Sequence, residues 1–324
     1  MRSSTCVIGL GLIGGSLLRA LSATGHQVSG YDASPDIRAL ARASGPGWRI
    51  AETVDEAMAG ADVVILAVPF PAVVPALDEI ATARYRGVLS DVTSVKGPVR
   101  RLVAERFPQA RYVGGHPMAG KEVSSFAASD PGLFTGCAWA LTLDPGTDQQ
   151  RGQLADWLGM ADLVTGLGAR VVPVTSAEHD AAVALISHLP HLVASGVAAV
   201  AGTGLPATLA AGSYRDGTRV AASQPGLVAG MCGGNAAALG PALDLFITRL
   251  SEARRLLDNA DPVRTLAGWL HDGHHARTGW PPRPGPVDEL PVSEEELLRL
   301  GRDGGWVTAV AADRRTVSAV RPLR

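Results

Sequence analysis

The chain begins with a glycine-rich turn that strongly limits the folds it can adopt. A short apolar stretch leads into the sequence GLGLIGG at residues 9–15, and a run with helical spacing follows. A strand, a glycine turn and a helix in this order make up a dinucleotide-binding unit. In such a unit Gly9 permits the tight turn, Gly11 lets backbone approach a pyrophosphate, and Gly14 allows the helix to pack closely. We therefore expect an N-terminal α/β domain of Rossmann-like topology.

An acid stands at the end of the second predicted strand, 28–31. Asp32 has the spacing, about 20 residues into the fold, of an acid that binds the adenosine ribose hydroxyls. Its charge would repel a 2′-phosphate, so we expect NAD rather than NADP. The alternative is that Asp32 only caps the helix starting at Ser34, but strand, glycines and acid together favour the cofactor hypothesis. The predicted cofactor contacts are Gly9, Gly11, Leu12, Ile13, Gly14 and Asp32, with Val68 and Pro69 after a later strand.

The hydrophobic pattern divides the chain into three parts. Continuous apolar runs such as 63–67 alternate with helical segments, which is typical of parallel strands covered on both faces. Long helices rich in small residues follow, and then a proline-rich linker, a short helix and a hairpin. We expect a NAD-binding domain at 1–174, an all-α substrate and dimerisation domain at 175–280, and a small tail at 281–324.

Composition excludes several classes of function. A chain of 324 residues with 46% hydrophobic residues and a net charge of −2 is long enough for two globular domains. Its arginines form no basic stripe, so we expect no nucleic-acid partner. The three cysteines are far apart and lack metal-ligand spacing, which argues against disulfides and a metal site and fits a reducing cytoplasm. The apolar run 181–211 raises the question of a membrane span. Two histidines and a proline in it favour instead a helix buried at an interface.

A histidine in the sequence GGHPMAG, at residues 114–120, is a candidate catalytic base. Pro117 cannot donate a hydrogen bond in a central strand, so we expect His116 in a loop. This loop would open at the carboxyl end of the strand 111–113, where open α/β sheets bind ligands. From these residues alone, His116 could equally be a turn histidine that only contacts water.

Three further segments leave a structural and a functional interpretation open. Ser94 follows a predicted strand, where a hydroxyl either caps a helix or orients an imidazole. His188 and His191 share one helix face, as buried polar groups of the core or as ligand contacts. The glycine-bounded segment 211–220 is expected to be a loop, in which Arg219 is either an exposed cation or a partner for a carboxylate.

Together these motifs resemble the prephenate and arogenate dehydrogenases of tyrosine biosynthesis. Besides the glycine turn, the resemblance rests on DVTSVK at 91–96, GHPMAG at 115–120, SHLPH at 187–191 and TRVA at 218–221, and it extends to about Leu257. It implies NAD(P)-dependent oxidative decarboxylation of a cyclohexadienol carboxylate, with prephenate as the expected substrate. Arogenate and 4-amino-4-deoxyprephenate are alternative substrates, and a non-catalytic NAD-sensing protein is a remote alternative.

The resemblance also implies roles for individual residues. His116 would take the proton from the ring 4-hydroxyl, and Ser94 would hydrogen bond to His116 and orient it. His191 and Arg219 would contact the substrate, Arg219 through a carboxylate, and Glu122 would help to gate the pocket. The helical domain would pair two chains into a homodimer.

Two positions depart from the family pattern. Lys121 stands where relatives commonly have a small residue, which adds a cation beside the predicted substrate site. Val228 stands where relatives often have a tryptophan, which removes an aromatic wall. Both changes concern the part of the site that would meet the substrate side chain, where prephenate carries a keto acid and arogenate an amino acid. The tail is too short for the regulatory amino-acid-binding domain of some relatives.

Overall fold

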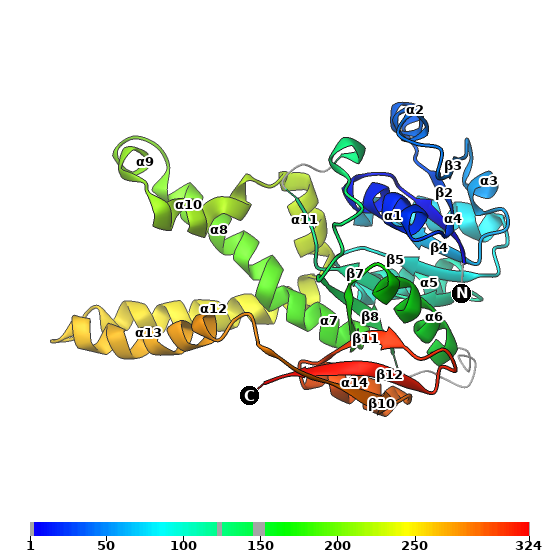
Figure 1. Cartoon of the computed structure of the whole chain (residues 1–324). Coiled ribbons are helices and arrows are strands. Elements are labelled where there is room, and N and C mark those ends of the chain that lie inside the picture. Colours follow the sequence, from blue (N-terminus) through cyan, green and yellow to red (C-terminus); the bar gives the residue numbers. More distant parts are fainter. Residues whose placement is uncertain (1–2, 122–124, 145–152, 324) are drawn as a thin grey trace.

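The computed structural model describes residues 3–121, 125–144 and 153–323. An α/β body carries two sheets, and a helical domain extends from it as two arms (Figure 1). The expected fold class, a Rossmann-like domain followed by an all-α domain and a short tail, is confirmed.

The first sheet is entirely parallel and has the order β3-β2-β1-β4-β5-β6. The order reverses direction between β1 and β4, which is where open α/β sheets bind their ligands. Helices cover both faces, so the central strands β1 and β4 are almost fully buried. Its strands are β1 (Ser4–Ile8), β2 (Gln27–Tyr31), β3 (Arg49–Ile50), β4 (Val63–Leu66), β5 (Val88–Asp91) and β6 (Arg111–Val113). Its helices are α1 (Leu12–Ala23), α2 (Pro35–Ala43), α3 (Val54–Met58), α4 (Val73–Thr82) and α5 (Gly97–Arg106).

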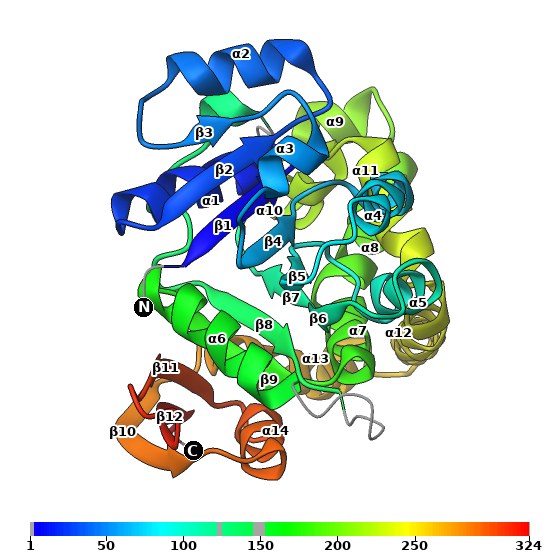
Figure 2. The same cartoon turned by 90° about the vertical axis from the view of Figure 1, so that its right-hand side faces the viewer.

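The second sheet is mixed and has the order β10-β12-β11-β9-β8-β7. Its strands β8 and β9 are parallel and are joined by α6 (Gln153–Gly166), whereas the other pairs are antiparallel. β7 contacts β5, so the two sheets meet there, as the neighbouring labels in Figure 2 show. The strands are β7 (Gly115–Pro117), β8 (Ala138–Thr142), β9 (Arg170–Val174), β10 (Pro284–Pro291), β11 (Trp306–Val310) and β12 (Thr316–Pro322).

The tail is part of this second sheet. Its short helix α14 (Glu294–Arg302) and the hairpin β11–β12 form as expected. A linker is expected at 280–286, and this is wrong in its second half, because residues 284–291 form β10 at the edge of the sheet. An edge strand tolerates prolines, since their missing N–H groups would otherwise face solvent. Leu290, Leu297 and Val307 of the tail pack into the same hydrophobic cluster as α1 and α6.

The helical domain begins with one long helical path. α7 (Ser176–Val183) continues through a π-helical turn (Ala184–His188) into α8 (Leu189–Ala201). A π turn changes the helical phase, and this one lies just before Pro190. The remaining helices are α9 (Leu205–Leu209), α10 (Gly212–Thr218), η5 (Arg219–Ala222), α11 (Pro225–Gly234), α12 (Ala236–Leu256) and α13 (Pro262–Thr278).

The loop predicted at 211–220 is wrong, because these residues form α10 and the start of η5. Two glycines made helix a poor local choice, but both elements pack against α8. Tertiary contact therefore outweighs the local preference.

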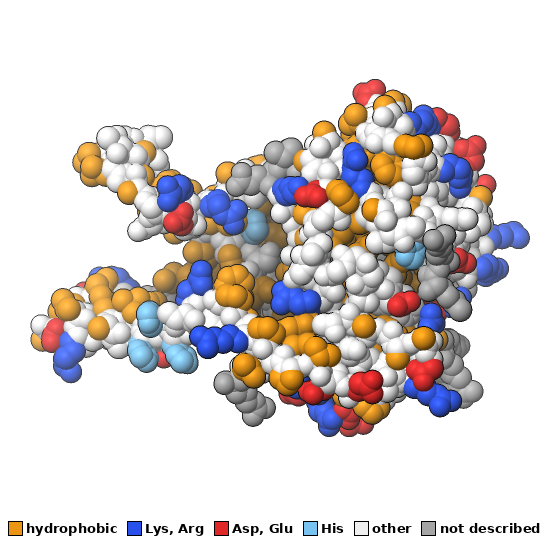
Figure 3. Space-filling model, viewed as in Figure 1, with side chains coloured by type: hydrophobic (Ala, Val, Ile, Leu, Met, Phe, Trp, Pro, Cys, Tyr) orange, Lys and Arg blue, Asp and Glu red, His pale blue; other side chains and the backbone are white. Residues whose placement is uncertain are grey.

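The two arms expose many large apolar side chains. Figure 3 shows orange side chains along both arms and a hollow between them. By length and composition alone, Ser176–Ala201 could cross a membrane, and so could α11 with α12, which are bent by 95°. Core helices of water-soluble proteins pass the same test. Exposed residues of the arms include Leu185, Ile186, Val197, Val200, Leu205, Leu209, Leu245, Leu250, Val263 and Leu270.

Candidate active site

The glycine turn forms a cradle at the N-terminus of α1. Gly9 has φ +96°, and a Cβ atom there would lie 2.5 Å from the carbonyl oxygen of Ala67. A Cβ on Gly14 would lie 1.8 Å from the carbonyl oxygen of Gly9, which is what close packing of α1 on the turn requires. At Gly11, by contrast, no described atom lies within 4 Å of the Cβ position. The space above Gly11 can therefore take a group that approaches the backbone.

Asp32 lies beside this cradle at the end of β2. Its Oδ2 accepts a hydrogen bond from Leu10 N at 2.7 Å, and its Oδ1 accepts one from Ser34 N at 2.9 Å. The residue that caps α2 is Ser34, whose hydroxyl accepts from Ile37 N. Each carboxylate oxygen of Asp32 keeps acceptor capacity for a hydroxyl.

The other predicted cofactor contacts lie around the same turn. Leu12 and Ile13 form the first turn of α1. Val68 and Pro69 follow β4, and a Cβ on Gly9 would lie 2.9 Å from Val68 Cγ1. These positions suit a dinucleotide, although contact with one stays a prediction.

His116 lies in a short edge strand rather than in the expected loop. It is the central residue of β7, opposite Ala140 of β8. The expectation was wrong because Pro117 excludes only a central strand. At the edge of a sheet, one side of the strand has no partner strand. A proline whose nitrogen faces that side therefore removes no hydrogen bond from the ladder.

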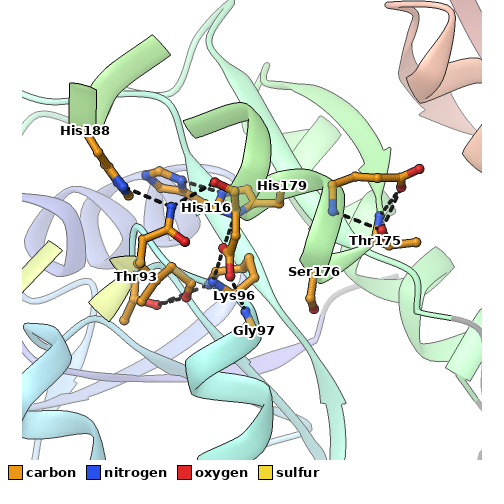
Figure 4. Close-up of polar contacts among 12 residues, drawn as sticks. Thr93, Lys96, Gly97, His116, Thr175, Ser176, His179 and His188 are labelled. Atoms are coloured by element: carbon orange, nitrogen blue, oxygen red, sulfur yellow. Dashed lines mark hydrogen bonds and ion pairs between the residues drawn. The ribbon is translucent and has the colours of Figure 1, made fainter. Parts of the chain in front are cut away.

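A chain of hydrogen bonds leads from His116 into the helical domain (Figure 4). His116 Nδ1 lies 2.9 Å from His179 Nε2, and His179 Nδ1 lies 2.9 Å from Asp180 Oδ1. Asp180 in turn accepts from the backbone N–H groups of Lys96, at 2.7 Å, and Gly97, at 2.8 Å. His179 and Asp180 were not predicted as site residues. Their only signal in the sequence is a polar pair just after the start of an otherwise apolar helix.

A buried ion pair holds the backbone next to His116. The Lys96 ammonium group donates to the Asp91 carboxylate, to Thr93 Oγ1 and to the carbonyl oxygen of Gly115. Asp91 also accepts from the Tyr112 hydroxyl at 2.9 Å and from Gly115 N at 3.1 Å. The side chains of Asp91 and Lys96 are both 0% exposed. The peptide groups on both sides of Gly115 are thereby fixed.

The surroundings keep the imidazoles neutral. Burial lowers the pKa of His116 well below its usual value, aided by electrostatic repulsion from His179, Lys96 and His188 in their protonated forms. Burial also lowers the pKa of His179, against the opposing effect of Asp180. For His188, burial lowers the pKa to about 4. At neutral pH His116 is therefore an uncharged base.

Among the described residues, neither Ser94 nor His191 has a hydrogen bond to a member of this chain of hydrogen bonds. Ser94 is half-buried between β5 and α5, but the partner of His116 Nδ1 is His179, so the expected orienting contact from Ser94 is replaced on that side. His191 lies on α8, where its Nδ1 is 2.9 Å from Ser187 O. Because a carbonyl only accepts, Nδ1 carries the proton. The Nε2 of a neutral His191 can therefore accept a hydrogen bond.

Arg219 and Lys121 are both exposed. Arg219 begins η5, which packs against α8, the helix that carries His191. Lys121 donates to Asp130 at 3.0 Å, an ion pair at the surface. Glu122 lies outside the described residues.

His188 has one ring nitrogen paired and one not. Its Nδ1 accepts from the Asn235 amide at 3.0 Å, whereas its buried Nε2 has no hydrogen-bond partner among the described residues. Across those residues, no group of three or more His, Cys, Asp or Glu side chains could hold a metal ion.

Comparisons with known proteins agree along most of the chain. The family model described as "Prephenate dehydrogenase, nucleotide-binding domain" matches residues 17–173, and "Prephenate dehydrogenase, dimerization domain" matches residues 175–271. The cyclohexadienyl dehydrogenase of Zymomonas mobilis is 36% identical over 265 residues, which cover 79% of this chain and 88% of the relative.

Solved structures give the same result. A candidate prephenate dehydrogenase from Corynebacterium glutamicum has a TM-score of 0.80 and 39% identity, covering 86% of this chain and 90% of its own. The prephenate dehydrogenase of A. aeolicus, solved with hydroxyphenyl propionate and NAD+, has a TM-score of 0.74 over 86% of this chain and 98% of its own. At 23% identity, that match shows a shared fold.

Proposed function

Because the chain belongs to the prephenate dehydrogenase family, we propose that it converts prephenate to 4-hydroxyphenylpyruvate by NAD-dependent oxidative decarboxylation. The observation that carries this proposal is His116, a neutral imidazole at the edge where the two sheets meet. Its Nδ1 is engaged by the helical domain, so Nε2 is left to act on a substrate.

The residues of the cradle fit a bound NAD. Gly11 offers open backbone at the positive end of α1 for the pyrophosphate, and Asp32 offers acceptors for the adenosine ribose. When bound, NAD supplies the acceptor for the hydride that leaves ring C4 of the substrate. We keep NADP as the less favoured cofactor because of the charge on Asp32.

His116 handles the proton of the reaction. As ring C4 becomes a carbonyl, the 4-hydroxyl proton moves to His116 Nε2. Cleavage of the bond to the ring carboxylate then releases CO2 and leaves its electron pair in the ring, which becomes aromatic. The proton returns from Nε2 to the phenolic oxygen, so His116 ends the cycle as it began. A well-placed general base of this kind contributes about 10²–10⁴-fold in rate.

Arg219 and His191 are proposed to bind the substrate. A guanidinium group stays charged in any surroundings and pairs well with a carboxylate. Each such charge-assisted hydrogen bond contributes about 1.5–3 kcal/mol. Glu122 keeps its proposed role at the gate. Ser94 keeps its proposed role of orienting His116, but only Nε2 is open to it, because His179 occupies Nδ1.

The three candidate substrates are prephenate, arogenate and 4-amino-4-deoxyprephenate, and the assay described below distinguishes them. Val228 is partly buried and packs with Ala184 and Leu189 in the core of the helical domain. Lys121 is directed to Asp130 by its ion pair, so it supplies no cation to a site unless this pair opens.

We also propose a cytoplasmic homodimer formed by the arms. The arms expose many large apolar side chains, and packing against the arms of a second copy of this chain would bury them. Val200 is 90% exposed and Val263 is 80% exposed, so both are suited to test this. Light scattering should find a dimer at micromolar concentration, and Val200→Glu with Val263→Glu should shift it to monomer. A wild-type monomer would contradict the arrangement.

One assay tests the function. The pure protein is incubated with NAD and, in turn, with the three candidate substrates, and NADH is recorded. His116→Asn should abolish turnover with little loss of substrate affinity in a direct binding measurement, whereas Arg219→Ala should chiefly weaken substrate binding and raise KM. NAD binding without turnover of any substrate would overturn the enzymatic proposal and favour a NAD-sensing protein.

A further inference from the structure

We propose that His179 and Asp180 act as positioning residues that fix the tautomer of His116, forming with it a three-membered chain of hydrogen bonds, called the relay below. This inference rests on the proposed function, because it assigns a task to the base of that reaction. Its members come from two domains: His116 from β7, and His179 and Asp180 from α7.

The relay is anchored at Asp180. Its Oδ1 accepts from Lys96 N and from His179, and its Oδ2 accepts from Gly97 N. Burial alone would raise the pKa of Asp180, but the hydrogen bonds from His179, Lys96 and Gly97 lower it overall. A Cβ on residue 97 would lie 2.9 Å from Asp180 Oδ2, so a glycine there makes room for the carboxylate. The first member is therefore a fixed anion.

An anionic carboxylate only accepts hydrogen bonds, and this determines the proton on His179. His179 Nδ1 faces Asp180, so Nδ1 must carry the proton. A neutral His179 then has a lone pair on Nε2, which faces His116 Nδ1 at 2.9 Å. His116 must donate from Nδ1, and its own lone pair stands on Nε2. Each tautomer thus follows from the one before it.

The same order of donors stabilises the state that follows proton uptake. When Nε2 of His116 takes the substrate proton, its Nδ1–H becomes the donor of a charge-assisted bond to His179. The Asp180 carboxylate supplies a negative charge on the far side of the His179 ring. The rings of His116 and His179 meet edge to face, with centroids 5.1 Å apart and planes at 69°. Without the relay, a neutral His116 could place its proton on either nitrogen, and only one of the two forms is a base at Nε2.

Two substitutions at position 179 separate this role from simple packing. His179→Phe fills the space but removes the acceptor. His179→Gln keeps an acceptor oxygen for His116 and loses the imidazole. We expect kcat to fall by about 10²–10³-fold in His179→Phe, with KM for substrate and NAD within about threefold of wild type. His179→Gln should recover at least about tenfold of that loss.

A spectroscopic measurement reports the histidine tautomers directly, whether or not the variants are active. In ¹⁵N NMR of ring-labelled histidine at neutral pH, His116 and His179 should both be Nδ1–H tautomers in the wild type. In the His179→Phe variant, His116 should become a mixture of its Nδ1–H and Nε2–H tautomers. In the Asp180→Asn variant, His179 should no longer be a single tautomer. His274→Gln, at an exposed position on α13, serves as the neutral control.

The outcomes distinguish the two proposals. Normal kcat in His179→Phe, while His116→Asn is inactive, would overturn the relay and leave the proposed function intact. A wild type without turnover would refute the function, and the tautomers would still decide the relay. Nε2–H tautomers in the wild type would refute the relay whatever the activity. If His179→Phe fails to fold, the Gln variant and the wild-type spectrum decide.

Discussion

Replacing Asp91 by Asn should force Lys96 to give up its proton while the protein stays folded. Both side chains are 0% exposed. The Asn carbonyl can take the place of Oδ1 and accept from Tyr112 and Gly115, which puts the amide NH2 group opposite the Lys96 amine. Two donors then face each other unless the amine becomes neutral and accepts.

The cost follows from the pKa of lysine. An exposed lysine has a pKa of about 10.4, or about 3.4 units above pH 7, and each unit corresponds to about 1.36 kcal/mol. Deprotonation at pH 7 therefore costs about 4.6 kcal/mol, close to the roughly 3–5 kcal/mol for breaking a buried pair. We expect the free energy of unfolding to fall by about 3–5 kcal/mol.

The loss should depend on pH in a defined direction. With Lys96 neutral when folded and charged when unfolded, the unfolded variant binds one more proton. Its stability then rises with pH by about 1.36 kcal/mol per unit relative to wild type. Between pH 7 and 8.5, about 2 kcal/mol of the loss should return.

Urea unfolding followed by circular dichroism at both pH values measures these quantities. The variant Asp91→Asn with Lys96→Met removes both charges, so it should be more stable than the single variant at pH 7 and show no extra pH slope. A single variant that loses less than about 1 kcal/mol, or loses the same amount at both pH values, would refute a cation held in the core by Asp91.

Gly14→Ala should lower Tm, because its Cβ would lie 1.8 Å from Gly9 O. Gly11→Ala should leave Tm unchanged and weaken NAD binding, because no described atom lies within 4 Å of its Cβ position. Equal Tm values for the two variants would contradict these assignments. Asp32→Ser should weaken NAD and improve the ratio of kcat/KM for NADP to that for NAD, and an unchanged ratio would remove Asp32 from cofactor choice. Burial lowers the pKa of His188 to about 4, so the unfolded chain takes up an extra proton below pH of about 6.5. Stability should therefore decline as pH falls from 6.5 toward 4, and a Tm constant from pH 7 to pH 5 would show that His188 is not buried as a neutral group.

Sequence reasoning succeeded where local constraints are strong. The glycine turn leaves few backbone solutions, so strand, turn and helix could be predicted with their order. The hairpin β11–β12 follows from alternation and a turn. The sequence identifies His116 as a candidate base, and that role stays a prediction. Its strand was missed, because nothing in the heptapeptide distinguishes an edge strand from a central one.

The relay could not be predicted in this way. His116 and His179 are 63 positions apart, and their contact exists because α7 packs against β8, the strand that pairs with β7. The buried pair of Asp91 and Lys96 is close in sequence, but it is completed by β7, where Gly115 hydrogen bonds to both side chains. Long-range packing, rather than any residue pattern, assembles these groups.

The position of the tail has a consequence for local unfolding. β11 pairs with β9, which leads directly into α7, and Arg302 of α14 donates to Glu178 at 2.6 Å. Glu178 completes the capping box that starts α7 with Thr175. Opening the tail would release an edge of β9 and remove the Arg302 partner of the capping box that starts the helix carrying His179. The tail and α7 should therefore exchange their amide hydrogens as one cooperative unit, so the last segment of the chain controls how long the site stays protected.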